Sequence, residues 1–425
     1  MKRLFYGWWM VGAGTGLQFL QSALLMQSFG AYVAVLRDDR GWSKTALSGA
    51  AALQQMEAAV LGPVLGWVID RFGPQGLIRI GVLTFGIGFM LLSTIDTLAG
   101  FYGAFIVMAI GSSFCGFFPI NVALIHWFSR WRARALSSLS FGLALGGVMV
   151  PVIAWSITTV GWRTTAFLSG VAYVAIGLPL ALVIRRRPED FGQTVDGLPS
   201  HLSGEKTPSE TAATDFTVRE ALRTPAFWLI SLGHGFALLV VHAVNVHAIT
   251  HMKEGLGYSV ESASLFITLM TFGQMAGVGV GWAIGDRYDK RLIAAACMLM
   301  HMCGLLLLTF SLAHAMVVGF AILHGVAWGL RGPFMQALRA DYFGRSSIGM
   351  ILGLSYMIIV LGQVGGPMIA GILADATGDY RVGFTTLALL AGVGSLFFVF
   401  AKKPAKPARR TLSASDSPRA SGARP

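Results

Sequence analysis

The segment "GWVIDRFGPQ", residues 66–75, ends a long apolar run with an Asp-Arg pair. It has a counterpart later in the chain, "GWAIGDRYDKR", residues 281–291. The two Asp-Arg pairs, which begin at Asp70 and Asp286, lie 216 residues apart. An offset of about 216 also separates other matching segments, such as "HWFSR" and "DYFGR". This constancy predicts a duplicated unit whose two copies run in the same orientation.

The composition around these segments is that of a membrane protein. Of the 425 residues, 55% are hydrophobic and 12% are charged, whereas a soluble domain averages roughly 25% charged residues. The apolar runs are about 20 residues or longer and do not alternate with period two, which predicts helices and not barrel strands. The expected fold class is an all-α polytopic membrane protein with twelve transmembrane helices in two pseudo-symmetric six-helix bundles.

The expected organisation follows from the spacing of the apolar runs. Spans are predicted at 8–36, 43–69, 76–95, 98–128, 134–160, 164–184, 226–252, 259–285, 291–312, 315–338, 346–374 and 382–401. The domains are then 1–184 (N-terminal bundle), 185–225 (central loop with an interfacial helix), 226–401 (C-terminal bundle) and 402–425 (a basic tail). The tail is rich in Pro, Ala, Ser, Lys and Arg, which predicts disorder.

Basic residues are distributed unequally between the two sides of the membrane. Of the 32 Lys and Arg residues, 25 fall on the side of the N-terminus and six on the other, which leaves Arg331 inside a span. This bias predicts cytoplasmic N- and C-termini in a plasma membrane, the inner membrane of a bacterium. The net charge of +12 is therefore a topology signal, and a nucleic-acid partner is not expected. The apolar run at the start is too long for a signal peptide.

The repeated segments resemble the signature of the major facilitator superfamily of secondary transporters. The first copy resembles the pattern G-x-x-x-D-R-x-G at Gly66, Asp70, Arg71 and Gly73, and it departs at residues 74–75, where the family usually has basic residues. The resemblance implies alternating access to a central cavity lined by spans one, four, seven and ten. It also implies a cytoplasmic gate formed by Gly66, Asp70, Arg71, Asp286 and Arg287. A carboxylate at such a helix end can lie at the N-terminus of a helix from the other half.

A finer resemblance is to the monocarboxylate and oxalate/formate porter branch of this superfamily. It rests on "FYGWWMV" at the start, "GWSKTALS" before span two, "RRRPEDFG" after span six and "REALRTPAFW" before span seven. Carriers of this branch often place a substrate-pairing arginine in span eight, and some place a lysine in span one or eleven. Those spans contain no internal cation here. The resemblance implies a small organic anion as substrate, bound by Arg331 alone.

Arg331 is the first candidate for substrate binding. A charge at the centre of a bilayer costs at least about 2.5–3.5 kcal/mol on insertion scales, so its retention needs a compensating interaction. A guanidinium stays ionised and can bind both oxygens of a carboxylate. The alternative is a structural ion pair with Glu57 or with a helix end. His324 and Trp328 share roughly one helix face with Arg331, and either is expected to line the cavity or to pack.

Glu57 is the candidate for proton coupling. Desolvation favours the neutral form of a carboxyl, and a nearby Arg331 would favour the charged form. An anion bound to Arg331 would remove that influence and favour protonation of Glu57, so that anion and proton bind together. The alternative is a structural carboxyl that bonds to polar neighbours.

Further polar residues lie in the predicted spans. Gln21, Asn121 and Asn245 belong to cavity-lining spans by resemblance, and helix–helix hydrogen bonding is the alternative for each. His247 and His251 have the spacing of metal ligands, but no carboxylate or thiol accompanies them, so no metal is expected. The three cysteines are expected to pack. No phosphate loop, nucleophile elbow or pair of catalytic carboxylates is present, so neither an enzyme nor an ATP-driven pump is expected, and no cofactor.

The sequence thus favours a proton-coupled carrier for a small organic anion, a monocarboxylate above all, that works as a monomer. Two alternatives use the same fold: efflux of hydrophobic or cationic compounds, and anion exchange of the oxalate/formate type. A sensor or scaffold that transports nothing is a third possibility, which the intact gate motifs disfavour.

Overall fold

The computed structural model describes residues 5–42, 44–197 and 215–405, and this part of the chain is almost entirely helical. Helices occur at each of the twelve positions where spans are expected. Ten of them, from the third position onward, are long and apolar enough to cross a membrane among the described residues. Residues 198–214 of the predicted central loop, residues 406–425 of the predicted disordered tail, and the N-terminal Lys2 and Arg3 lie outside the described residues.

The helices divide between the two halves of the chain. The first half contains α1 (Tyr6–Gln21), α2 (Phe29–Arg40), α3 (Lys44–Phe72), α4 (Pro74–Leu92), α5 (Leu98–Cys115), α6 (Phe117–Trp127), α7 (Arg132–Leu145), α8 (Val150–Val160) and α9 (Trp162–Val183). The second half contains α12 (Val218–Leu222), α13 (Pro225–Glu254), α14 (Val260–Ile284), α15 (Lys290–Thr309), α16 (His314–Phe343), α17 (Ile348–Thr377) and α18 (Arg381–Phe400).

Three predicted spans of the first half are interrupted. A π-helical turn, Ser22–Met26, separates α1 from α2, and the extended backbone of Gly116 separates α5 from α6. A 3-10 turn lies between α7 and α8, and Pro151 lies in the first turn of α8. A proline has no N–H to donate, so it is accepted in a first turn but does not continue a regular helix. The prediction of one continuous helix for each of these spans is therefore corrected.

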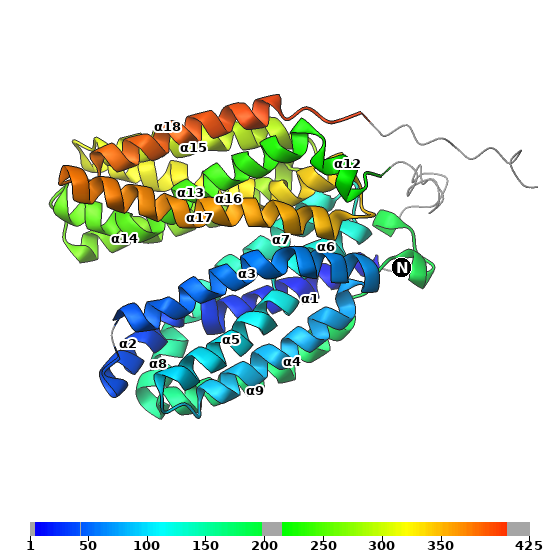
Figure 1. Cartoon of the computed structure of the whole chain (residues 1–425), viewed down its shortest axis with the longest axis horizontal. Coiled ribbons are helices and arrows are strands. Elements are labelled where there is room, and N and C mark those ends of the chain that lie inside the picture. The colour runs from blue at the N-terminus through cyan, green and yellow to red at the C-terminus, as the bar shows by residue number, and fades with distance from the viewer. Residues whose placement is uncertain (1–4, 43, 198–214, 406–425) are drawn as a thin grey trace, which may run out of the picture.

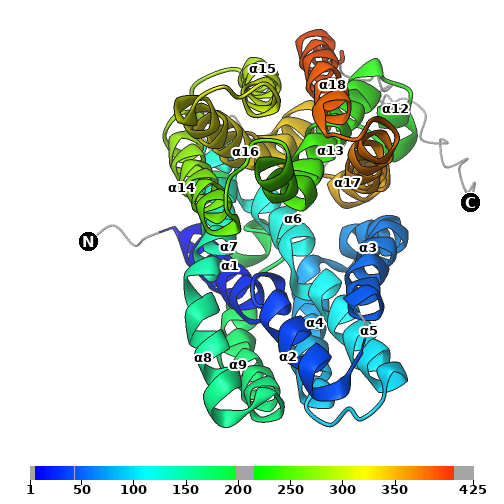
Figure 2. The same cartoon turned by 90° about the vertical axis from the view of Figure 1, so that its left-hand side faces the viewer.

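The two halves form two bundles that lie side by side (Figures 1 and 2). Helices α1–α9 make one bundle and α13–α18 the other, and each bundle has a cluster of buried apolar side chains to which the opposite bundle adds a few residues where the two meet. In Figure 1 the bundles meet at the end that carries the label N and separate toward the opposite end. The exact domain boundaries, 184, 225 and 401, stay a prediction.

Contact between the bundles is most extensive at two helix pairs, α3 with α17 and α7 with α14, and α7 also contacts α16. Glycines allow α3 and α17 to approach closely: Gly62 packs on Gly353, and a Cβ atom at Gly66 would collide with the carbonyl of Gly349. Small residues at such positions let helix backbones come together in lipid. We call the end where the bundles meet, formed by residues 129–134, 185–197, 286–290 and 341–350, the closed end.

The central loop contains one short helix, α12, where an interfacial helix is expected, and its place at the membrane interface stays a prediction. Thr217 and Glu220 form a capping box at its start, where the Thr217 side chain accepts from the Glu220 N–H and the Glu220 carboxylate accepts from the Thr217 N–H. Thr224 then caps α13, and Pro225 occupies the first turn. These caps satisfy N–H groups that the first turn of a helix leaves free and fix where α12 and α13 begin.

Candidate functional site

Arg331 lies in the interior of α16, two residues before Pro333. Its side chain is completely buried, with 0% of the residue exposed. Nε, Nη1 and Nη2 have no hydrogen-bond partner among the residues that the structure describes. Leaving a charged group buried without partners is costly in any protein interior. The side chain is therefore neither directed at lipid nor held by a permanent bond.

The groups within electrostatic range of Arg331 come from three helices of the second bundle. They are Cys297 and His301 on α15, His234 on α13, and His324 and Arg339 on α16. All of these neighbours are buried. The sequence contains no Asp or Glu in residues 226–253, 262–285 or 292–340, which make up most of α13–α16. The interior of the second bundle thus holds a cluster of basic groups without a carboxylate from these helices.

Glu57 lies in the other bundle, on α3. Its Oε2 accepts a hydrogen bond from the hydroxyl of Ser113 on α5 at 3.0 Å, and its Oε1 has no partner in the described part of the chain. Tyr356 on α17 is within electrostatic range of this carboxyl. No ion pair joins Glu57 to Arg331 among the described residues. In this conformation the structure does not bring the two predicted groups together, so the alternative of a permanent Arg331–Glu57 pair is not what it shows.

The secondary candidates differ in their surroundings. Gln21 donates from Nε2 to the Oγ of Ser112 at 2.6 Å and to its carbonyl at 3.2 Å, a bond between α1 and α5. Asn121 donates to the carbonyl of Phe117 on its own helix, and its Oδ1 is buried without a partner among the described residues. Asn245 is exposed, and Trp328 is half-buried against the apolar cluster of the second bundle. Gln21 therefore has the helix–helix contact of the alternative interpretation.

The span-seven histidines bond to separate backbone carbonyls. His247 Nε2 lies 3.0 Å from the carbonyl of Pro367, and His251 Nε2 lies 3.3 Å from that of Leu308. Their ring nitrogens thus point at different helices, α17 and α15. In the described residues no group of three His, Cys, Asp or Glu side chains is placed to hold a metal ion.

A pocket of about 390 Å³ opens between the bundles, where α1 and α7 face α14. Its lining combines hydroxyls and apolar groups: Thr15, Ser137, Ser138, Phe141, Val278, Gly279 and Trp282. None of these residues was predicted as a site residue. A hydroxyl inside an apolar run is common in packed membrane helices, so the sequence offers no signal that singles them out.

Each Asp of the repeated motif caps a helix of the opposite bundle at the closed end. Asp70 accepts hydrogen bonds from the N–H groups of Gly349 at 2.9 Å and Met350 at 2.8 Å, at the start of α17. Asp286 accepts from the N–H groups of Ala133 at 2.8 Å and Arg134 at 3.3 Å, at the start of α7. A carboxylate at a helix N-terminus also interacts favourably with the helix dipole. The two contacts are related by the internal repeat, as the motif copies are.

The surroundings of Asp286 act on its ionisation. Burial raises the pKa of this carboxyl above its usual value, and the hydrogen bonds from the N–H groups of Ala133 and Arg134 partly lower it. The Arg134 guanidinium lies 3.8 Å from the carboxylate and 5.1 Å from the ring centre of Trp282. Asp286 therefore connects the two bundles through backbone and side chain at once.

The other predicted gate residues contribute less directly. Gly66 permits the contact of α3 with α17. Arg71 is exposed, and its guanidinium lies 5.6 Å from the ring centres of Trp67 and Phe72 on its own helix. Arg287 is exposed as well. The two arginines of the repeated motif thus face outward, while the two aspartates face the opposite bundle.

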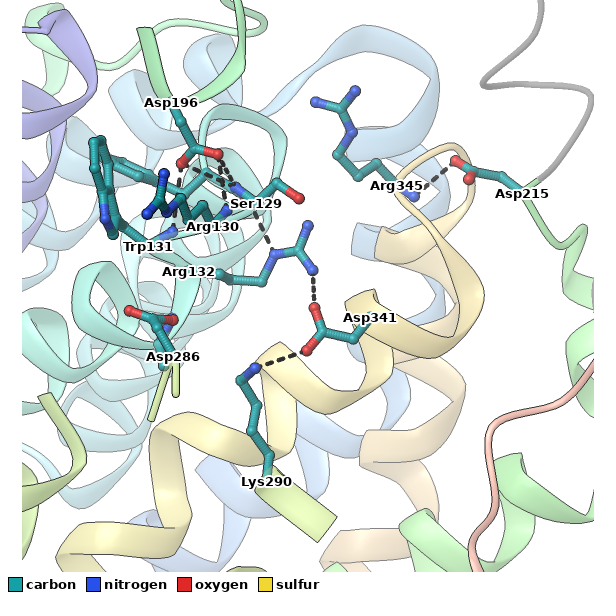
Figure 3. A network of polar contacts seen from close by, with 12 residues as sticks. Ser129, Arg130, Trp131, Arg132, Asp196, Asp215, Asp286, Lys290, Asp341 and Arg345 are labelled. Atoms are coloured by element: carbon teal, nitrogen blue, oxygen red, sulfur yellow. Dashed lines mark hydrogen bonds and ion pairs between the residues drawn. The ribbon is translucent and has the colours of Figure 1, made fainter. Parts of the chain in front are cut away.

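The structure adds closed-end residues that the sequence did not single out (Figure 3). Arg132 on α7 forms an ion pair with Asp341 on α16, and Lys290 on α15 binds the second oxygen of Asp341 at 2.9 Å. The Nη1 of Arg345 donates to the carbonyl of His126 at 2.8 Å, again from one bundle to the other. The sequence did contain a signal that could have indicated these residues. Asp341 and Arg345 belong to "DYFGR", the second copy of the repeated segment "HWFSR".

The central loop is attached to the same end by two aspartates. Asp196 accepts from the N–H groups of Ser129 at 3.2 Å and Arg130 at 2.8 Å, and Asp215 accepts from those of Arg345 at 2.8 Å and Ser346 at 3.0 Å (Figure 3). Positions 130 and 345 correspond in the internal repeat. The loop thus contacts positions at the closed end of the two bundles that are related by the internal repeat.

Two bundles of repeated helices, joined at one end by helix caps that cross between them, are the architecture of a secondary membrane transporter. A family model of the major facilitator superfamily matches residues 12–246 and 230–423. The chain therefore belongs to the major facilitator superfamily and is a multi-pass integral membrane protein. Its family and fold are those of transporters, not of enzymes.

Individual relatives refine the placement within the family. The chain is 27% identical over 436 residues to monocarboxylate transporter 13 of Bos taurus, with 97% of this chain and 95% of that protein covered. It is 26% identical over 349 residues to the fujikurins efflux protein of Gibberella fujikuroi, with 78% and 68% covered. Among solved structures, the proton:xylose symporter XylE matches with a TM-score of 0.75 at 16% identity, covering 94% of this chain and 96% of that one. The expected resemblance to the monocarboxylate branch is thus confirmed.

Proposed function

We propose that this protein moves a small organic anion, a monocarboxylate in particular, across the plasma membrane together with a proton, by alternating access. The observation that carries the proposal is Arg331, a completely buried guanidinium without a hydrogen-bond partner among the described residues. A carboxylate bound there would supply both the missing charge and the missing acceptors. The likeness to monocarboxylate transporter 13 supports the same class of substrate.

The anion reaches Arg331 only after a rearrangement, since the side chain is covered in this conformation. The bundles meet at the closed end and separate at the other end (Figure 1). We take the closed end as cytoplasmic, because most Lys and Arg residues lie on that side. Movement of the second bundle that opens a path to Arg331 would then admit the anion from one side at a time.

Glu57 is the proposed proton-coupling residue of the first bundle. Its free Oε1 and its single hydrogen bond from Ser113 leave room for a proton on the carboxyl. Protonation neutralises Glu57 and the bound anion compensates Arg331, so the loaded site has fewer uncompensated charges to move through the membrane, which lowers the cost of reorientation. His324, Trp328, Asn121, Gln21 and Asn245 stay proposed as residues of the substrate path.

The test is uptake of labelled lactate, pyruvate, formate and oxalate into proteoliposomes with an imposed pH gradient. We expect Arg331→Lys and Arg331→Gln to reduce uptake at least tenfold, because lysine cannot bind two carboxylate oxygens in the same way and glutamine has no charge. The matched control is Arg381→Gln, which removes an exposed arginine paired with Asp379 at the opposite end of the protein. Unchanged uptake in both Arg331 variants would exclude a binding role.

Efflux of hydrophobic compounds is the second candidate function, supported by the likeness to the fujikurins efflux protein. The pocket between α1, α7 and α14 has apolar walls that suit such a compound. Anion exchange of the oxalate/formate type is distinguished by counterflow. Internal unlabelled anion would accelerate uptake of the labelled anion without any pH gradient in an exchanger, whereas a proton symporter needs the gradient for accumulation.

A further inference from the structure

A pair of buried histidines lies in the interior of the second bundle, within electrostatic range of Arg331. His301 on α15 and His324 on α16 are both 0% exposed, and their Nδ1 atoms are 3.1 Å apart. The ring centres are 4.5 Å apart and the rings are inclined by 66°, a T-shaped arrangement. Phe320 covers His324 from the same helix with a ring-centre distance of 5.5 Å. The pair is therefore buried away from water, among the basic groups in the interior of the second bundle.

The geometry of the pair fixes where protons can be. Two imidazoles that share a hydrogen bond between Nδ1 atoms need one Nδ1–H donor and one Nδ1 acceptor, so in the neutral pair the rings have opposite tautomers. The Nε2 atom of each ring is buried without a partner in the described part of the chain. One of these Nε2 atoms carries a hydrogen and the other a lone pair. The lone pair is a free position for one additional proton.

We propose that the His301–His324 pair is a proton-binding site that fills when an anion occupies Arg331, which rests on the anion binding proposed above. One H⁺ from the aqueous phase adds to the free ring nitrogen and makes an imidazolium–imidazole pair, and no other bond breaks. The charged pair has a stronger hydrogen bond than the neutral pair. Release of the anion reverses the step.

The charges around the pair explain why the proton would depend on the anion. His324 precedes Arg331 by two helical turns, about 10 Å along the axis, and both histidines are within its electrostatic range. A second positive charge in this enclosure is repelled by Arg331, and the repulsion is strong because little water screens it. A carboxylate on Arg331 cancels that repulsion. Anion and proton then stabilise each other, as symport requires.

No other group in the enclosure can take the place of the anion. The helices packed against α16 present His234 from α13 and Cys297 from α15, and α16 itself adds Arg339. Helix α14 contains no Asp, Glu, His, Lys or Arg in residues 262–284, and α17 contains none in residues 348–374. Helices α6 and α7, which also contact α16, contain His126, Arg132 and Arg134 but no Asp or Glu in residues 117–145. The negative charge that favours protonation therefore has to come from a ligand.

The experiment measures anion binding and proton uptake separately on the purified full-length protein. Titration calorimetry with pyruvate, lactate, formate and oxalate, repeated in buffers with different ionisation enthalpies, yields both the affinity and the protons taken up per bound anion. We expect the pair to take up about one proton per anion, since it has one free position, in addition to the proton proposed for Glu57. We expect His301→Gln and His324→Gln each to lower the uptake by about one proton per anion, because each variant removes the free position of the pair. Anion binding should remain measurable in His301→Gln, because His301 is not among the residues proposed for the substrate path. His314→Gln, an exposed histidine on the same helix bonded to Tyr258, should change neither quantity.

A second measurement needs no variant. The nitrogen chemical shifts of isotopically labelled histidine in the wild-type protein distinguish imidazolium from imidazole, and the expected result is an imidazolium signal that appears only with the anion. Proton uptake that stays undiminished in both histidine variants and disappears in Glu57→Gln would overturn the inference and leave the proposed function intact. A wild type that binds none of the four acids would instead contradict the proposed function itself.

Discussion

Arg331 shows how much a single residue of a membrane protein can reveal. In the sequence it is a lone cation in an apolar helix, and in the structure its guanidinium is completely buried without a partner among the described residues. Arg339, two turns further along α16, is also buried, but it donates to the carbonyl of Met335 at 2.8 Å and contacts His234 at 3.4 Å. The two arginines therefore differ in the contacts that compensate their burial.

This difference predicts opposite effects on stability. Replacing Arg331 by methionine removes an uncompensated charge, whose cost is roughly 2.5–3.5 kcal/mol on insertion scales. We expect Arg331→Met to raise the temperature of thermal unfolding in detergent and to abolish transport. The comparison variant is Arg339→Met, which loses two hydrogen bonds and should gain less stability or none. A lower unfolding temperature for Arg331→Met would mean that the arginine has a stabilising partner in the folded protein.

Sequence reasoning finds some residues of the site and misses others for a physical reason. Arg331 and Glu57 stand out because a charge is rare in an apolar run, and Asp70 and Asp286 stand out because the motif repeats. His301 was not singled out, since an uncharged histidine in a membrane helix has no pattern of its own. Its importance comes from the Nδ1 atom of His324, which lies 3.1 Å away and belongs to a different helix.

At the scale of elements, the contact between α3 and α17 depends on glycine. A Cβ atom at Gly66 would collide with the carbonyl oxygen of Gly349, because the two backbones touch. The same contact brings Asp70 to the start of α17, where it bonds to two N–H groups. Packing and capping at this helix pair are thus coupled through one small residue.

We therefore expect Gly66→Ala to destabilise the closed end, by about 1–3 kcal/mol as in other overpacked sites. The matched control is Gly76→Ala on α4, where nothing lies within 4 Å of the added Cβ atom. There the substitution should be neutral or slightly stabilising, because alanine favours the helix by roughly 0.5–1 kcal/mol. Thermal unfolding of both variants checks the difference, and equal effects would show that the contact of α3 with α17 tolerates separation.

The helix interruptions belong to the same scale. The apolar runs indicated where helices lie, but they did not reveal the break at Gly116 or the π-helical turn at residues 22–26. Hydropathy reflects the transfer of side chains into lipid and does not depend on whether the backbone is helical. A helix break is tolerated where neighbouring helices supply hydrogen bonds to the freed backbone groups. The breaks therefore depend on packing, which the sequence pattern does not record.

At the scale of the whole molecule, the closed end is held by polar contacts between the bundles. Asp341 has a central place, since it pairs with Arg132 of the other bundle and with Lys290 of its own (Figure 3). Charged hydrogen bonds of this kind contribute roughly 1.5–3 kcal/mol each. A conformational equilibrium between closed and open forms responds strongly to a change of that size.

We expect Asp341→Asn to shift the population toward the form that is open at this end, roughly tenfold for a loss of 1.4 kcal/mol. The shift is measured as the distance between two spin labels, attached to Gly76→Cys in the first bundle and Tyr288→Cys in the second, both exposed positions near the closed end. The labels are introduced in a Cys303→Ser background, which lacks the exposed native cysteine. Asp289→Asn is the control, because Asp289 pairs with Arg291 inside one bundle only. A distance distribution that is identical in Asp341→Asn and the wild type would show that this pair does not hold the end closed.

The sequence by itself determined that the protein lies in a lipid bilayer, that it is helical, that its two halves are duplicates and which family it belongs to. These properties follow from residue composition, from the length of the apolar runs and from the constant offset between repeated motifs, all of which can be read along the chain without knowing its fold. Only the tertiary structure decided the partners: which helix each aspartate caps, that Arg331 and Glu57 form no bond, and that His301 contacts His324. The reason is that a hydrogen bond requires atoms about 3 Å apart, and the arrangement of packed helices alone determines which distant residues come that close.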